Sequence, residues 1–213
     1  EVHVVELATG NRYIEAYDQL ILSPGAEPVR PHIPGVDSDR VFTLRSVADM
    51  DRISQFISEQ NPRKAIVIGA GYIGLEMAEN LCARGLSVEV VEMLDQVMPV
   101  LDKEMAWFLH RHLSEHGVAV QLGERVRSID QAGSSLKISL SSGGQLSCDF
   151  AMLAAGVRPE VKLAREAGLE IGEQGGIKVN EYLQTSDPDI YAIGDAVEVR
   201  DFVLGGATLV PLA

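Results

Sequence analysis

The chain has 213 residues, of which 46% are hydrophobic and 23% charged, an ordinary balance for a globular protein of one or two domains. Its formal net charge of -13 argues against a nucleic-acid partner, because such partners are bound through Lys and Arg. The apolar runs are too short to span a membrane, and we expect no signal peptide. Cys82 and Cys148 lack metal-ligand or redox-motif spacing, and such sparse use predicts a reducing, cytoplasmic environment.

The N-terminal segment predicts an antiparallel meander over residues 1–23. Strands at 2–7 and 12–16 flank the turn at 9–11, and a third strand is predicted over 18–23. A proline-rich stretch follows, which predicts an extended crossover between domains; its prolines are Pro28, Pro31 and Pro34.

The middle of the chain alternates apolar runs with helical periodicity, which predicts a parallel sheet with right-handed crossovers. The predicted strands are 65–69, 87–92, 118–122 and 150–154, and the predicted helices are 46–59, 72–84 and 102–116. A second meander is predicted from strands at 125–130, 136–141 and 145–147. Two further short strands are predicted at 175–179 and 190–193, near the end of the chain.

The central motif is a G-x-G-x-x-G sequence between a buried strand and a helix. Gly69 permits a tight turn, Gly71 lets the backbone approach a pyrophosphate, and Gly74 allows close packing of helix and strand. The start of the helix offers free N–H groups and a positive dipole end to phosphates. This context predicts a dinucleotide site of the Rossmann type. The competing interpretation is a glycine-rich turn that serves packing alone.

A carboxylate completes this motif. Glu92 ends the next predicted strand, where an acid accepts hydrogen bonds from the adenosine ribose. No Arg or Lys occurs in residues 93–96 to bind a 2′-phosphate, so the sequence favours NADH over NADPH. The competing interpretation is that Glu92 is a solvated strand end.

Several motifs together resemble the flavin-dependent pyridine nucleotide–disulfide oxidoreductases, in the branch of CoA-disulfide reductases, NADH oxidases, NADH peroxidases and persulfide reductases. The resemblance covers essentially the whole chain. It rests on Ser23–Ala26 with Ile33–Gly35, Gly69–Glu76, Ala154–Pro159, Thr185–Ser186 with Ile190–Ala196, and Gly205–Ala213. The family's N-terminal FAD fingerprint, its redox cysteine and its C-terminal dimerisation domain are not found in this sequence, so we expect a central fragment that is inactive alone.

The resemblance also implies roles for individual residues. Contacts to NADH are implied for Gly69, Gly71, Tyr72, Ile73, Gly74, Glu92 and Gly156, and contacts to FAD for Ser23, Pro24, Gly25, Arg45, Gly194 and Asp195. Tyr72 would cover the flavin and swing aside for nicotinamide, with Glu76 nearby. Packing by Tyr72, a solvated Glu76, a surface Arg45 and a helix-capping Asp195 remain open alternatives.

These observations predict an α/β fold in three segments. A Rossmann-like NADH-binding domain with a parallel sheet and a β-meander spans 40–155, between FAD-domain segments at 1–39 and 156–213. The resemblance implies a homodimeric flavoenzyme that passes electrons from NADH to a small-molecule disulfide, persulfide, peroxide or oxygen. The alternatives are a non-enzymatic NADH-binding redox module and a flavin-free NAD dehydrogenase. No metal site is expected, because His112 and His116 share a helix face without an evident third ligand.

Overall fold

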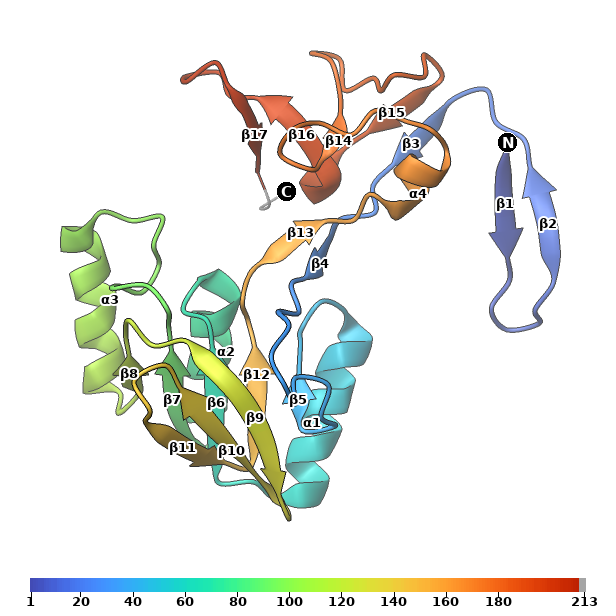
Figure 1. Ribbon diagram of the computed structural model, residues 1–213. Coiled ribbons are helices and arrows are strands. Elements are labelled where there is room, and N and C mark those ends of the chain that lie inside the picture. The colour runs from blue at the N-terminus through green and yellow to red at the C-terminus, as the bar shows by residue number, and fades with distance from the viewer. Residues whose placement is uncertain (211–213) are drawn as a thin grey trace. The chain divides into compact units, whose positions relative to one another are not determined.

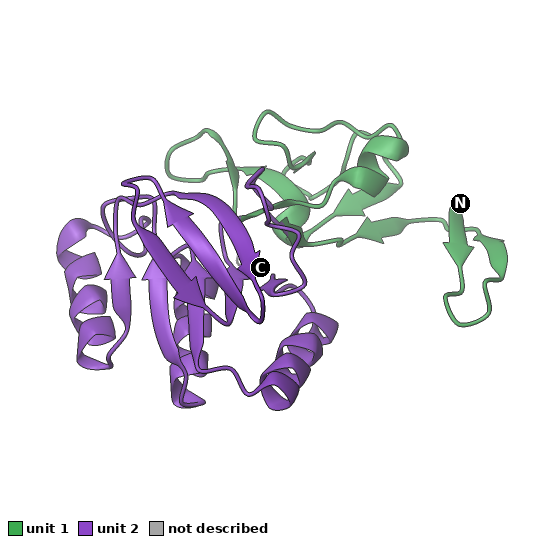
Figure 2. Ribbon diagram, turned by 60° about the horizontal axis from the view of Figure 1, so that its bottom comes forward, with its two compact units in different colours: residues 1–27, 157–213 green, residues 28–156 purple. Residues whose placement is uncertain are grey.

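A computed structural model describes residues 1–210 and divides the chain into two compact units. One unit joins residues 1–27 to 157–213, and the other comprises residues 28–156 (Figure 2). We call them unit 1 and unit 2. Residues 28–39, which the sequence analysis grouped with the first FAD-domain segment, belong to unit 2: Val29 N–H donates to the Gly156 carbonyl, and Ile129 N–H donates to the Pro34 carbonyl.

Unit 2 is built on a five-stranded sheet in the order β5-β12-β6-β7-β8, and all its pairings are parallel (Figure 1). Its strands are β5 (Val41–Phe42), β6 (Lys64–Ile68), β7 (Ser87–Val91), β8 (Ala119–Gln121) and β12 (Phe150–Leu153). The connecting helices are α1 (Val47–Gln60), α2 (Tyr72–Ala83) and α3 (Lys103–Glu115). The predicted alternating architecture is therefore confirmed, and the short β5 is an addition that the sequence analysis missed.

Two apolar cores cover the two faces of this sheet. Along β6, Ala65 and Val67 pack with the helices, whereas Ile66 and Ile68 pack with an antiparallel meander. That meander comprises β9 (Val126–Ala132), β10 (Ser135–Leu140) and β11 (Gln145–Cys148). Unit 2 is thus a three-layer structure in which a parallel sheet is buried on both sides, which explains its continuous apolar strands.

The α1 helix illustrates how the sequence specifies its own boundaries. The Ser46 side chain accepts from Asp49 N–H, and the Asp49 carboxylate accepts from Ser46 N–H, a reciprocal capping box. The helix ends at Asn61, which adopts the left-handed conformation ahead of Pro62. The prediction of a helix over 46–59 is confirmed.

Unit 1 contains smaller sheets. A hairpin of β1 (Val2–Val5) and β2 (Arg12–Glu15) turns at Gly10, as predicted. Strand β3 (Leu20–Leu22) pairs in parallel with β15 (Ile190–Ala192), so the prediction that it continues the antiparallel meander is wrong. The physical reason is local: a turn glycine with positive φ joins β1 to β2, but no such turn signal precedes β3.

The rest of unit 1 is formed largely by the returning segment. It contains α4 (Lys162–Glu166), the 3₁₀ turn η1 (Gly194–Ala196), and the sheet β14-β16-β17, with strands Ile177–Lys178, Val197–Arg200 and Ala207–Leu209. Strand β13 (Val157–Pro159) pairs with β4 (Ala26–Pro28) where the chain crosses from one unit to the other. Among residues 1–210, this unit has a separate core of eight buried apolar residues. Within residues 1–210, no helix has the length and apolar character needed to cross a bilayer.

Candidate functional site

A hollow of about 600 Å³ in unit 2 contains the residues that the glycine motif predicts. Gly69, Gly71, Glu92 and Gly156 all line it. They come from the segments that follow β6, β7 and β12, three neighbouring strands of one parallel sheet. The structure therefore brings together residues far apart in sequence at the carboxyl ends of the strands, where ligands of open α/β sheets bind.

Each glycine of the motif has a different structural role. Gly69 adopts a φ of +108°, and a Cβ there would overlap the Ala154 carbonyl. A Cβ on Gly74 would overlap the Gly69 carbonyl, so this glycine lets α2 pack against the turn. Gly71 has open space around the position of a Cβ and forms the N-cap of α2. Of these three motif glycines, Gly71 alone is unobstructed, and it is the one where a pyrophosphate would approach the backbone.

Glu92 is only 7% exposed, and its carboxylate connects the glycine turn to the segment after β7. Its Oε2 accepts from Ala70 N–H at 2.7 Å, and its Oε1 accepts from Leu94 N–H at 2.9 Å. Each carboxylate oxygen retains acceptor capacity after these bonds. Glu92 therefore both shapes the turn and is able to accept hydrogen bonds from ribose hydroxyls.

The remaining residues predicted to contact NADH lie around this turn but do not line the hollow. Gly74 is buried beneath the turn, and Ile73 is exposed on α2. Tyr72, with half of its surface exposed, and Glu76 line a separate groove of about 360 Å³ between α2 and α3. This groove explains why Tyr72 and Glu76 lie together, but their gating role stays a prediction.

Unit 1 brings together part of the predicted FAD set. Leu22 pairs with Ala192 in the parallel β3–β15 pair, and Ile193 N–H donates to the Leu22 carbonyl. Consequently Ser23 and Gly194 follow the same ends of adjacent strands, and a Cβ on Gly194 would lie 3.6 Å from the Ser23 Oγ. Asp195 follows within η1, while Pro24 and Gly25 continue from Ser23.

Arg45 lies in unit 2, immediately before α1, and its backbone N–H donates to the Asp49 carboxylate.

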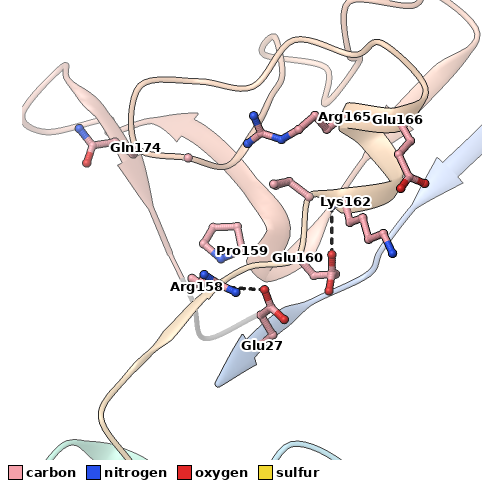
Figure 3. A pocket seen from close by; sticks show the side chains of 10 residues that line it. Glu27, Arg158, Pro159, Glu160, Lys162, Arg165, Glu166 and Gln174 are labelled. Atoms are coloured by element: carbon pink, nitrogen blue, oxygen red, sulfur yellow. Dashed lines mark hydrogen bonds and ion pairs between the residues drawn. The ribbon is translucent and has the colours of Figure 1, made fainter. Parts of the chain in front are cut away.

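A second hollow, of about 460 Å³, lies in unit 1 beside the returning crossover (Figure 3). There the Arg158 guanidinium pairs with Glu27 at 2.7 Å, and Glu160 accepts from Lys162 N–H. Such exposed pairs contribute little stability.

The sequence analysis missed two residues at the main hollow. Arg125 and Arg127 line it from the β8–β9 connection and β9, together with Met93 and Leu94. Residues 93–96, next to Glu92, contain no Arg or Lys, and nothing in the linear pattern indicates that β9 returns to the same place.

Hydrogen bonds lower the pKa values of two acidic residues near the site. Burial raises the pKa of Glu89, but hydrogen bonds from Lys64 and Gln121 and the Lys64 charge outweigh it, so this pKa lies below its ordinary value. Hydrogen bonds from Ser142 and Ser141 likewise lower the pKa of Glu124.

The His112 and His116 rings lie 4.2 Å apart, and no group of three or more His, Cys, Asp or Glu side chains in residues 1–210 could hold a metal.

The fold and the glycine–carboxylate site define a Rossmann-type dinucleotide-binding protein. The chain matches the pyridine nucleotide-disulphide oxidoreductase family over residues 1–210 and belongs to that family. A relative, NADH oxidase from Methanocaldococcus jannaschii, is 45% identical over 204 residues, which are 95% of this chain and 45% of that protein.

Two solved structures extend the comparison. Reduced CoADR-RHD from Bacillus anthracis has a TM-score of 0.94 and 50% identity, covering 99% of this chain and 38% of that one. Water-forming NADH oxidase from Lactobacillus brevis, bound to NADH, has a TM-score of 0.90 and 31% identity, covering 99% of this chain and 46% of that one. The chain thus spans less than half the length of each of these relatives.

Proposed function

We propose that this chain carries the NADH site and part of the FAD site of a flavin-dependent NAD(P)H oxidoreductase. The observation that carries the proposal is the meeting of Gly69, Gly71 and Glu92 in one hollow at the carboxyl ends of parallel strands. Dinucleotides bind at such a site through a helix N-terminus for the pyrophosphate and a carboxylate for the ribose.

The residues of unit 2 fit NADH in three ways. The open space at Gly71 admits the pyrophosphate to the N-terminus of α2. The unused lone pairs of Glu92 accept hydrogen bonds from the adenosine ribose. Gly156, with a φ of +103° and nothing near the position of a Cβ, leaves room at the opposite side of the hollow.

The residues of unit 1 fit the flavin in a similar way. Ser23, Gly194 and Asp195 lie at the ends of the adjacent parallel strands β3 and β15, and Pro24 and Gly25 continue the same edge. These residues would hold FAD, which when bound accepts a hydride from NADH. For Arg45, which lies in unit 2, an FAD contact is implied by the family resemblance alone. The protein's contribution is to bind and orient both cofactors.

The acceptor belongs to the class of small-molecule disulfides, persulfides, peroxides or oxygen, and the whole enzyme is a homodimer. These proposals rest on the family and on the motifs that this chain shares with its NADH oxidase and disulfide-reducing branch. The two cysteines are both unpaired, which fits a cytoplasmic location.

We further propose that Tyr72 gates access to the flavin. Its ring is half exposed at the first residue of α2, directly after the turn that receives the pyrophosphate. In the flavin-loaded enzyme, Tyr72→Ala should leave NADH binding largely intact and speed oxidation of the reduced flavin by oxygen, with Tyr72→Phe as the matched control. Unchanged reoxidation in stopped-flow measurements would contradict this role.

The NADH assignment is tested by calorimetric titration of the 213-residue chain. Glu92→Gln should weaken NADH binding by about ten-fold, because a charge-assisted hydrogen bond to ribose contributes about 1.5 kcal/mol. Glu89→Gln is the matched control, since Glu89 is equally buried on β7 but does not line the hollow. Equal affinities for NADH in both variants, with both folded, would refute the assignment.

A further inference from the structure

Both backbone polar groups of Ala70, the middle residue of the glycine turn, are held by segments outside the turn. Ala70 N–H donates to Glu92 Oε2 at 2.7 Å, and the Ala70 carbonyl accepts from Met98 N–H at 2.8 Å. The next donor, Gly71 N–H, has no hydrogen-bond partner among residues 1–210, and Gly71 lines the main hollow. Since the carbonyl and the N–H of a trans peptide point in opposite directions, the bond from Met98 directs Gly71 N–H away from Met98.

Met98 makes this bond from a backbone conformation that few side chains adopt. Its φ is +46°, in the left-handed region that favours glycine. The neighbouring residues impose this conformation: Leu101 N–H donates to the Met98 carbonyl at 2.9 Å, which closes a turn with Pro99 in its second position. The side chain of Gln96 then donates from Nε2 to the Leu101 carbonyl at 2.8 Å. A non-glycine residue held in this way beside a binding site points to a functional constraint on its backbone.

The side chain of Met98 lies in a different place from its N–H. It is only 5% exposed and lines the groove between α2 and α3 together with Tyr72. The preceding residue, Val97, is fully buried in the core on the helix side of the sheet, so the segment is anchored. The direction of the N–H depends on the backbone of Met98, whereas the filling of the groove depends on its side chain, and substitutions separate the two.

We propose that Met98 is a positioning residue for the dinucleotide, whose left-handed backbone holds the Ala70 carbonyl so that Gly71 N–H faces the pyrophosphate. The inference rests on the proposed NADH site and assigns Met98 no contact with the cofactor. The ribose is assigned to Glu92, which does not depend on the bond from Met98. Loss of that bond therefore weakens ligands that contain a pyrophosphate and spares a ligand that has the ribose alone.

The test is a set of calorimetric titrations of the 213-residue chain with NADH, ADP-ribose and adenosine. Met98→Leu and Met98→Ile place isomeric side chains at the same buried position, but only the β-branched isoleucine strongly disfavours positive φ. Met98→Ile should weaken NADH and ADP-ribose by about ten-fold and adenosine by less than about three-fold. Met98→Leu is the matched control and should change all three by less than about three-fold, because it conserves volume and is not β-branched.

Two further variants examine the backbone without a β-branched residue. Met98→Gly adopts positive φ freely, so it should keep the ADP-ribose affinity within about three-fold although the side chain is lost. Gln96→Leu leaves Met98 in place but removes the donor to the Leu101 carbonyl. It should weaken ADP-ribose by about three-fold relative to adenosine, and it decides the matter if Met98→Ile does not fold.

The outcomes separate the inference from the function beneath it. Equal weakening of ADP-ribose and adenosine by Met98→Ile, or equal losses in Met98→Leu and Met98→Ile, would overturn the inference and indicate a packing role. Unchanged ADP-ribose affinity in folded Met98→Ile, or in Gln96→Leu where Met98→Ile does not fold, would overturn it as well. Failure of the folded wild-type chain to bind NADH at all would instead refute the proposed function.

Discussion

The two units of this chain differ in how completely they cover their own sheets. Unit 2 is one continuous segment whose parallel sheet is buried by helices on one face and by a meander on the other. Unit 1 is assembled from two segments, its core holds eight buried apolar residues, and side chains such as Leu7 and Phe202 are almost fully exposed. The dinucleotide residues of unit 2 are correspondingly fixed by backbone and carboxylate hydrogen bonds, whereas unit 1 offers two strand ends and a short turn.

The largest expected effect is on the stability of unit 2. Phe150 is fully buried and forms an aromatic cluster with Phe42 and Phe56. Phe150→Ala should cost about 3–5 kcal/mol through lost burial and the cavity left behind. The single tryptophan, Trp107, lies on α3 of unit 2, so its fluorescence reports the unfolding of this unit.

The matching variant in unit 1 is Ile177→Ala, which removes an equally buried side chain. It should cost about 2–5 kcal/mol in unit 1 but leave the Trp107 transition in place. A shift of that transition by Ile177→Ala as large as that caused by Phe150→Ala would contradict the prediction that the two units unfold separately.

The glycine turn offers a sharper comparison within unit 2. Gly74→Ala should destabilise the unit by about 1–3 kcal/mol, because its Cβ overlaps the Gly69 carbonyl. Gly71→Ala should retain the stability of the unit, since its surroundings are open, but weaken NADH binding by about ten-fold or more by blocking the close approach of the pyrophosphate. Thermal unfolding and NADH titration of both variants check this, and a reversed pattern would contradict the assigned roles.

A smaller effect on stability is expected from Glu89, the buried acid on β7. Since the pKa of Glu89 is lowered in the folded state, its contribution is complete above its ordinary value of 4.5 and is lost as the pH falls through the lower folded value. Glu89→Gln should cost about 1 kcal/mol at neutral pH and flatten the acid side of the stability profile. Denaturant unfolding between pH 3 and pH 7 measures both, and an unchanged acid slope would argue against the Lys64–Glu89 pair.

The two cysteines test burial without a change in stability. Burial raises the pKa of Cys148 to about 12, and burial also raises the pKa of Cys82. At pH 8 the thiolate fraction of Cys148 is roughly a thousand-fold below that of an ordinary thiol, so a disulfide reagent should modify Cys82 first. Unfolding should expose both, and rapid modification of Cys148 in the native chain would contradict its burial.

The sequence predicted most of unit 2 because its signals are local. Helical periodicity, the capping residues Ser46 and Asn61, and the G-x-G-x-x-G turn each specify structure over a few neighbouring residues. The same reasoning found Glu92, whose role follows from its place at the end of a strand. It failed where pairing is non-local: β3 joins β15 across most of the chain, and no pattern near Leu20 specifies that partner.

Arg125 and Arg127 were missed for the same reason. Their contribution to the hollow depends on two backbone hydrogen bonds between distant segments and on a bulge in β9. Neither feature leaves a periodic signal in the sequence. The predicted domain limits at residues 39 and 155 rest on the proline-rich crossover and on the family resemblance, whereas the compact units divide after residues 27 and 156.

The most direct test of the contrast between the units is a pair of calorimetric titrations, with NADH and with FAD, on the same 213-residue chain. The account predicts one NADH bound per chain and an FAD affinity weaker by about ten-fold or more, because unit 2 holds its dinucleotide residues in a single fixed hollow. FAD binding as tight as that of NADH, or a folded chain that binds no NADH, would contradict it.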